Sequence, residues 1–145
     1  MRAAEKKTTG RFTIEFDVAN NEDILLARRG FLEPAKVRRM KVQGVVDSGA
    51  TRLVLPESVV KRLGLSLGPK VQVRYTDRRS AKRDTAKNVH VEIMGREGTF
   101  TALCEPRRRT ALVGAIVLED LDYLVDCTNQ RLFPRDPRFI ISEIE

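Results

Sequence analysis

Several residue types on which functional sites often depend are scarce in this chain. Its 145 residues include no tryptophan, one histidine and two cysteines, and aromatic residues make up 6% of the sequence. So few aromatic side chains argue against a platform on which nucleic-acid bases would stack. With His90 as the only histidine, a Ser-His or Cys-His nucleophile pair has little support. Cys104 and Cys127 stand apart without the spacing of a metal site, and we expect reduced thiols rather than a disulfide.

Long apolar runs are also missing. No stretch of the sequence approaches the roughly 20 residues that a membrane-spanning helix needs. Residues 1–7, Met-Arg-Ala-Ala-Glu-Lys-Lys, lack the apolar centre of a signal peptide. We therefore expect a cytoplasmic protein without a membrane partner. The composition, with 41% hydrophobic and 32% charged residues, predicts one globular domain.

Basic residues exceed acidic ones, by 27 Lys and Arg to 20 Asp and Glu, for a net charge of +7. Such a balance prompts the question of a nucleic-acid partner. The sequence shows no recognition helix and no zinc spacing, and its basic residues are dispersed in small groups at predicted turns. The groups are Arg28-Arg29, Arg38-Arg39, Arg78-Arg79, Lys82-Arg83 and Arg107-Arg108-Arg109. This pattern favours a solvated basic surface, and a nucleic-acid-binding β-barrel is the less favoured alternative.

Much of the chain alternates apolar and polar residues with a period of two, which is typical of half-buried strands. Strands are predicted over residues 12–18, 24–32, 37–46, 52–55, 71–75, 89–93, 99–104, 116–118, 123–125 and 131–133. We expect the second strand to pair back on the first as a hairpin. A short helix is predicted over 56–64, because Pro56 suits a first helical position and Gly64 suits a helix end. A second is predicted over 119–122. Many short strands with two short helices predict an all-β fold, a small barrel or sandwich.

The two ends of the chain differ from this pattern. Residues 1–10 are polar and aperiodic, and we expect a flexible arm. Residues 11–136 form the predicted domain. Residues 137–145 form a tail in which the apolar segment Phe139-Ile140-Ile141 is a candidate terminal strand, placed at an interface.

One carboxylate follows directly on the apolar end of a predicted strand. The sequence from Gly44 to Thr51 is Gly-Val-Val-Asp-Ser-Gly-Ala-Thr, which places Asp47 after two valines. An ionised acid beside a core costs free energy unless it is hydrogen-bonded, so a chain that has one there is expected to use it. Asp, Ser and Gly are also ordinary residues of a strand-ending turn. The motif alone leaves both interpretations open.

In its setting the motif resembles the active-site loop of the retropepsin-like aspartic proteases, which carry Asp-Thr/Ser-Gly-Ala/Ser after an apolar strand. The resemblance covers roughly residues 12–134, and it rests on the order and spacing of three segments. These are the loop Asp47, Ser48, Gly49, Ala50 and Thr51; the second-half apolar-Gly motif Leu112, Val113 and Gly114; and, in the position of the flap hairpin, Asp77, Arg78, Arg79, Ser80, Ala81, Lys82 and Arg83. It implies an all-β fold, a small closed barrel with one or two short helices.

Two features depart from the family's pattern. Ala115 follows Gly114, where the family often has Arg, Asn or Asp, and single-domain prokaryotic members are closer in this respect than viral ones. The segment in the flap position is charged rather than glycine-rich, which leaves the substrate preference open.

The resemblance implies an aspartic endopeptidase. Such enzymes use two facing carboxylates: an ionised one takes a proton from water, and a protonated one donates to the peptide carbonyl. Because the chain has one Asp-Ser-Gly loop, the resemblance implies a homodimer with Asp47 of each chain at the twofold axis. Ser48 would hydrogen-bond across that axis, and Gly49 would allow close approach of a peptide or protein substrate. No metal or organic cofactor is implied. A non-catalytic dimerisation or peptide-binding module on the same fold is the principal alternative.

Overall fold

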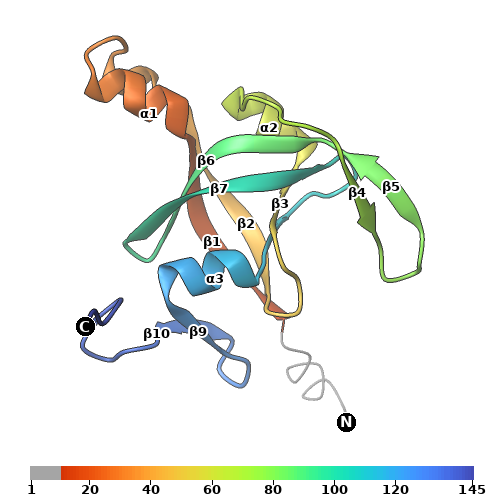
Figure 1. Cartoon of the computed structure of the whole chain (residues 1–145), viewed down its shortest axis with the longest axis vertical. Coiled ribbons are helices and arrows are strands. Elements are labelled where there is room, and N and C mark those ends of the chain that lie inside the picture. The colour runs from red at the N-terminus through yellow and green to blue at the C-terminus, as the bar shows by residue number, and fades with distance from the viewer. Residues whose placement is uncertain (1–10) are drawn as a thin grey trace.

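The computed structural model describes residues 11–145, which form a small β-barrel with short helices around it (Figure 1). The strands are β1 (Arg11–Asn20), β2 (Arg39–Asp47), β3 (Leu53–Pro56), β4 (Val71–Arg74), β5 (Ser80–Arg83), β6 (Thr85–Ile93), β7 (Arg96–Glu105), β8 (Ala111–Val113), β9 (Tyr123–Asp126) and β10 (Arg131–Pro134). The α-helices are α1 (Asn21–Arg28), α2 (Glu57–Leu63) and α3 (Ala115–Leu121), and a 3-10 turn, η2, spans Pro34–Lys36.

Six strands close the barrel in the order β1-β2-β8-β3-β7-β6. The short strand β8 lies between β2 and β3, parallel to β2 and antiparallel to β3. Strands β3 and β7 are also parallel, whereas β1 pairs antiparallel with both β2 and β6. The prediction of an all-β, small closed barrel with short helices is confirmed.

The hydrophobic core fills the inside of this barrel. Its residues alternate with exposed ones along the strands, because successive side chains of a strand point to opposite faces of the sheet. Along β1 the buried side chains include Phe12, Phe16 and Val18, and between them lie residues that are exposed or half-buried. Helix α2 turns Val59, Val60 and Leu63 toward the core. Gly64, predicted to end this helix, adopts a left-handed conformation with φ of 62°, which costs a residue without a Cβ little. The helix predicted at this position is confirmed.

The strand predicted over residues 24–32 is wrong, because the chain forms helix α1 there. The side chain of Asn20 caps this helix by accepting a hydrogen bond of 3.1 Å from the backbone N–H of Asp23. Glu22 and Asp23 place negative charge in the first turn, where the helix dipole favours it. The helix begins directly after β1, so no hairpin partner for β1 forms from this segment.

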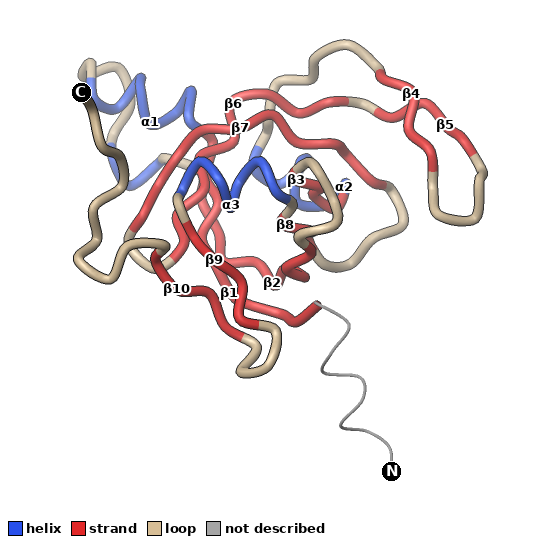
Figure 2. Tube along the Cα trace, turned by 60° about the horizontal axis from the view of Figure 1, so that its bottom comes forward, coloured by secondary structure: helices blue, strands red, loops and turns tan. Residues whose placement is uncertain are grey.

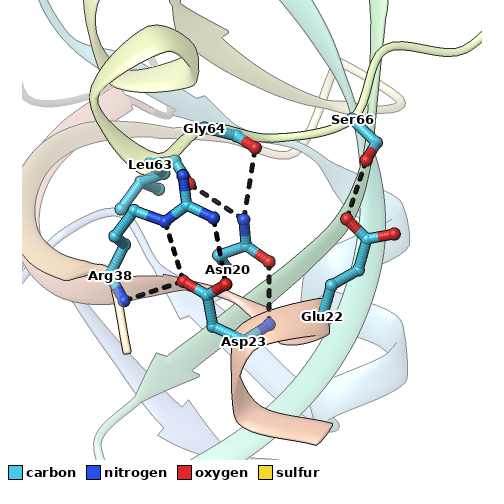
Figure 3. A network of polar contacts seen from close by, with 7 residues as sticks. All are labelled: Asn20, Glu22, Asp23, Arg38, Leu63, Gly64 and Ser66. Carbon is cyan, nitrogen blue, oxygen red and sulfur yellow. Dashed lines mark hydrogen bonds and ion pairs between the residues drawn. The ribbon is translucent and has the colours of Figure 1, made fainter. Parts of the chain in front are cut away.

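Tertiary contacts stabilise the start of α1 (Figure 3). The carboxylate of Asp23 is almost fully buried and accepts three hydrogen bonds from Arg38, at 3.0 Å from its backbone N–H, 2.8 Å from Nε and 3.0 Å from Nη2. Asn20 donates to the carbonyl of Leu63 at 2.9 Å. The hydrogen bonds from Arg38 hold the pKa of Asp23 below its ordinary value, against the opposing effect of burial. This network joins β1, α1 and α2 to Arg38, which directly precedes β2. Its residues come from separate segments, so the pattern of any one segment does not predict it.

The strand predicted over residues 116–118 is wrong as well. Helix α3 begins at Ala115, directly after Gly114, and buries Val117, Leu118 and Leu121. These positions lie on one face of a helix, and a short apolar run does not distinguish this arrangement from a buried strand.

Two hairpins project from the barrel (Figure 2). One pairs β4 with β5, and the other pairs β9 with β10, whose strands were predicted over 123–125 and 131–133. Residues 137–145 form no strand within the described chain, so the predicted terminal strand is not formed in one copy. The predicted arm, residues 1–10, lies outside the described residues.

Among the helices of residues 11–145, none has the length and apolar character required to cross a membrane.

Candidate active site

Asp47 is the last residue of β2, and its carboxylate is held from two sides. Oδ1 accepts a hydrogen bond of 3.0 Å from the backbone N–H of Gly49, and Oδ2 lies 3.0 Å from Nη2 of Arg11. The backbone N–H of Ala50 donates to the Asp47 carbonyl at 3.0 Å, which closes a tight turn. The Asp47 side chain is 15% exposed. Hydrogen bonding and a nearby cation offset the cost of placing an ionised acid at the edge of the core.

The tip of the loop points to solvent. Ser48 and Gly49, which follow Asp47, are exposed, as are Thr51 and Arg52 beyond them. A loop whose base is hydrogen-bonded and whose tip is open can receive a substrate or a second chain.

The second predicted motif lies against this loop. Strand β8 pairs with β2 so that Val113 lies beside Val46, and it pairs with β3 on its other side. The chain then leaves β8 at Gly114 and enters α3. The backbone N–H of Ala115 donates to the Ala50 carbonyl at 2.8 Å. The backbone N–H of Ile116 donates to the Thr51 carbonyl at 3.0 Å.

Gly114 is required by space rather than by its backbone conformation. Its φ of −94° and ψ of −176° suit any residue. A Cβ at this position, however, would lie 2.6 Å from the Arg52 carbonyl oxygen, 2.7 Å from the Thr51 carbonyl carbon and 2.8 Å from the Arg52 nitrogen. All three obstacles are backbone atoms, which cannot rotate away as a side chain can. The structure therefore brings the apolar-Gly motif and the Asp47 loop into direct contact.

The segment predicted as a flap lies in the β4–β5 hairpin. Its turn runs from Tyr75 to Arg79, whose backbones are joined by a hydrogen bond of 2.8 Å, and Arg78 has a positive φ of 71°. The hairpin tip is shorter than the predicted flap segment 77–83, because Ser80–Arg83 forms β5. The projecting hairpin is present, and its function as a flap stays a prediction.

Glu105, at the end of β7, anchors this hairpin. Its carboxylate accepts a hydrogen bond of 2.6 Å from the Tyr75 hydroxyl and forms an ion pair of 3.2 Å with Nε of Arg83. Burial, followed by the hydrogen bond to Glu105, raises the pKa of Tyr75 above its ordinary value. The guanidinium groups of Arg79 and Arg83 lie 5.2 Å and 5.7 Å from the centre of the Tyr75 ring. These contacts tie Tyr75, at the turn of the hairpin, and Arg83, at its base, to the end of β7.

Two pockets of about 240 Å³ each flank the start of β3. The first lies between this segment, β7 and α3, and is lined by Arg52, Leu53, Thr99, Phe100, Thr101, Ile116 and Val117. The second lies toward the hairpin and is lined by Arg52, Val71, Gln72, Val73, Thr85, Thr101, Ala102 and Leu103. Arg52 borders both.

Sequence reasoning missed three residues at this site: Arg11, Arg52 and Glu105. Arg11 lies opposite Asp47 where β1 pairs with β2. The apolar-polar alternation of a strand does not show which residue of the neighbouring strand it faces, so no signal in the sequence pointed to this pair. Arg52 follows the recognised motif by one residue, so its place in the loop was a usable signal. Residues 11–145 contain no group of three or more His, Cys, Asp or Glu side chains that could hold a metal ion.

The family model described as "Aspartyl protease" matches residues 33–117, more than half of the chain. The chain belongs to the aspartyl protease family. The matched span contains the loop at Asp47, the β4–β5 hairpin and Gly114, and the resemblance to retropepsin-like proteases is thereby confirmed. The search of curated proteins found no match.

Among solved structures, this aspartyl protease domain is similar to the EIAV protease complexed with the inhibitor HBY-793. The identity is 18%, the TM-score is 0.52, and the match covers 79% of this chain and 90% of that chain. At this identity the likeness shows a shared fold.

Proposed function

We propose that the chain is an aspartic endopeptidase that acts as a homodimer with Asp47 of each chain at the twofold axis. Membership of the aspartyl protease family supports the chemistry. The observation that carries the proposal is the placement of Asp47 at the end of β2, with its loop held by Gly114 and its tip exposed. One chain offers one such loop, so the second carboxylate has to come from a second copy.

In this proposal the two carboxylates share one proton, because like charges at close range cannot both ionise. The ionised Asp47 takes a proton from water, and the oxygen of that water forms a bond to the peptide carbonyl carbon. The protonated Asp47 gives its proton to the carbonyl oxygen. The tetrahedral intermediate then breaks its C–N bond: the nitrogen takes the proton that the first Asp47 received from water, and a hydroxyl of the intermediate returns its proton to the other Asp47 as the carbonyl re-forms. The N–H of Gly49 orients the carboxylate, and no metal takes part.

The ion pair between Arg11 and Asp47 has to change for this chemistry. A guanidinium has only donors, and a positive charge beside a carboxyl group favours its ionised form. A dyad that shares one proton is therefore favoured when at least one of the two Arg11 side chains leaves its Asp47. The Arg11 side chain is 60% exposed, so few packing contacts oppose this movement.

The proposal is tested by digestion of a denatured protein pool with the wild type and with Asp47→Asn. We expect the variant to lose proteolysis while the fold and the dimer persist, because Asn is nearly isosteric but cannot serve as the base. Asp17→Asn, which removes a half-exposed carboxylate from β1 outside the loop, the hairpin and both pockets, is the matched control and should keep full activity. Unchanged turnover in Asp47→Asn would show that the site is assigned wrongly.

Self-association is tested by a dilution series with sedimentation. Activity per chain should fall as the dimer dissociates, and excess Asp47→Asn chains should inhibit the wild type by forming inactive heterodimers. A monomer with full activity per chain would refute the shared site.

The Arg11–Asp47 ion pair also favours a second candidate, a non-catalytic module that dimerises or binds peptides on the same fold. A permanent ion pair would keep Asp47 from acting as an acid. Arg11→Gln separates the two candidates, because it removes the charge and leaves the strand intact. An inactive wild-type dimer whose Arg11→Gln variant is also inactive at every pH would favour the non-catalytic module. Activity in either protein would favour the peptidase.

A further inference from the structure

Positive charge is concentrated around the β4–β5 hairpin and the loop beside it. Residues 70–83 contain six Lys and Arg and one Asp, and residues 106–109 contain three Arg, in a chain whose net charge is +7. Some of these cations have partners: Arg79 pairs with Asp77, Arg83 with Glu105 and Lys70 with Asp84. Those without an ion pair among residues 11–145 include Arg74, Arg78 and Lys82 on the hairpin and Arg107 and Arg109 on the loop. The hairpin therefore presents an excess of positive charge.

Arg52 places one such charge inside the candidate site. It lines the pocket toward α3 and the pocket toward the hairpin, and it is the one charged residue that lines either of them. The polar neighbours in these pockets are Gln72 and the hydroxyls of Thr85, Thr99 and Thr101. Arg52 forms no ion pair within the described residues, and no acid competes for it in either pocket. A cation in this setting favours an anionic side chain from a bound molecule.

The backbone of Arg52 is held in place. It lies five residues after Asp47 and directly precedes β3, and its carbonyl oxygen and nitrogen lie against Gly114. The neighbouring Thr51 carbonyl accepts from α3. The guanidinium therefore projects from a fixed point of the loop that carries Asp47, and a peptide bound over this loop would pass it.

We propose that Arg52 selects acidic peptide segments, by pairing with an Asp or Glu side chain in one of the two pockets, while the basic hairpin attracts such segments to the site. This inference rests on the proposed function, because it assigns the substrate class of the same site. A nucleic acid fits less well. Single-stranded nucleic acid needs exposed aromatic rings for stacking, whereas the Tyr75 ring of the hairpin lies beneath Arg79 and Arg83.

The cleavage profile tests the substrate class. Peptides released from a denatured protein pool are identified by mass spectrometry for the wild type, Arg52→Glu and Arg62→Glu. Arg62 is the matched control, because it is exposed on α2 and lines neither pocket. We expect acidic residues to be enriched near wild-type and Arg62→Glu cleavage sites, and basic residues near those of Arg52→Glu. Identical profiles in all three proteins would overturn the proposal.

A binding measurement tests the preference for acidic peptides without proteolysis. It therefore still applies if the chain turns out to have no peptidase activity. Asp47→Asn protein, with and without Arg52→Glu, is titrated into a fluorescein-labelled 12-residue peptide rich in Glu, its Gln counterpart, and a 12-nucleotide single-stranded DNA. We expect the Glu peptide to bind most tightly and Arg52→Glu to weaken it by at least about fivefold, since a charged hydrogen bond is lost. Equal binding of the Glu and Gln peptides, or tighter binding of the DNA, would refute the proposal.

Discussion

Replacing Gly114 by alanine should displace the loop that carries Asp47. The new Cβ would lie 2.6 Å from the Arg52 carbonyl oxygen, whereas ordinary contacts begin at 3.4 Å, so the two have to separate by the difference of 0.8 Å. A movement of that size along the hydrogen bond from Ala115 to Ala50 would stretch it from 2.8 Å to about 3.6 Å, beyond the range of a hydrogen bond. The variant keeps a favourable backbone conformation, so the entire effect is steric.

The expected cost combines two effects. Overpacking of a rigid site costs about 1–3 kcal/mol, and each of the two backbone hydrogen bonds from α3 contributes about 0.5–1.5 kcal/mol. If the loop moves away, the overpacking is relieved but the hydrogen bonds are weakened, so the two costs do not add in full. We therefore expect Gly114→Ala to lower the free energy of unfolding by about 2–4 kcal/mol. Urea denaturation followed by far-UV circular dichroism measures it, since the chain has no tryptophan.

Gly95→Ala is the control for this experiment. Gly95 has a φ of 88° and no atom within 4 Å of an added Cβ, so its substitution costs only the left-handed conformation, about 1–2 kcal/mol. Hydrogen exchange should show reduced protection of the Ala115 and Ile116 amides in Gly114→Ala and unchanged protection in Gly95→Ala. If Gly114→Ala were as stable as the wild type, with both amides protected, the account of the contact between Gly114 and the loop would be wrong.

Two further predictions concern stability and thiol chemistry. Asp23→Asn should lower the free energy of unfolding at pH 7 by about 1–3 kcal/mol, because it removes a charged partner of Arg38, which is half-exposed and therefore partly screened. The pKa of Asp23 is lower in the folded chain than its ordinary 3.8. The stability that the ionised Asp23 contributes is therefore complete above pH 3.8 and is lost as the pH falls through the folded pKa. A difference in unfolding free energy between variant and wild type that did not shrink in acid would contradict this prediction. Burial raises the pKa of the Cys104 thiol, whereas Cys127 is half-buried. Ellman's reagent should therefore label one thiol of the native chain quickly and the second only on unfolding, and equal rates would refute the burial of Cys104.

The sequence by itself determined the local features of this protein. Apolar alternation predicted most of the barrel strands, because residues two apart share a face of a strand. Pro56 and Gly64 marked the limits of α2 through their backbone preferences. The turn after β2, with its single carboxylate, was recognisable at Asp47 because short polar residues and glycine form such turns. Its catalytic role stays a prediction.

Only the tertiary structure decided which segments meet. A period of two reports which face of a strand is buried, but neither its partner nor its register. For this reason the insertion of β8 between β2 and β3, the pairing of Arg11 with Asp47 and the position of Arg52 between two pockets required the folded chain. Helix α1 shows the same limit, because its apolar residues 24–26 suit a strand. Contacts of Asp23 with Arg38, 15 residues away, stabilise the start of the helix that forms there instead.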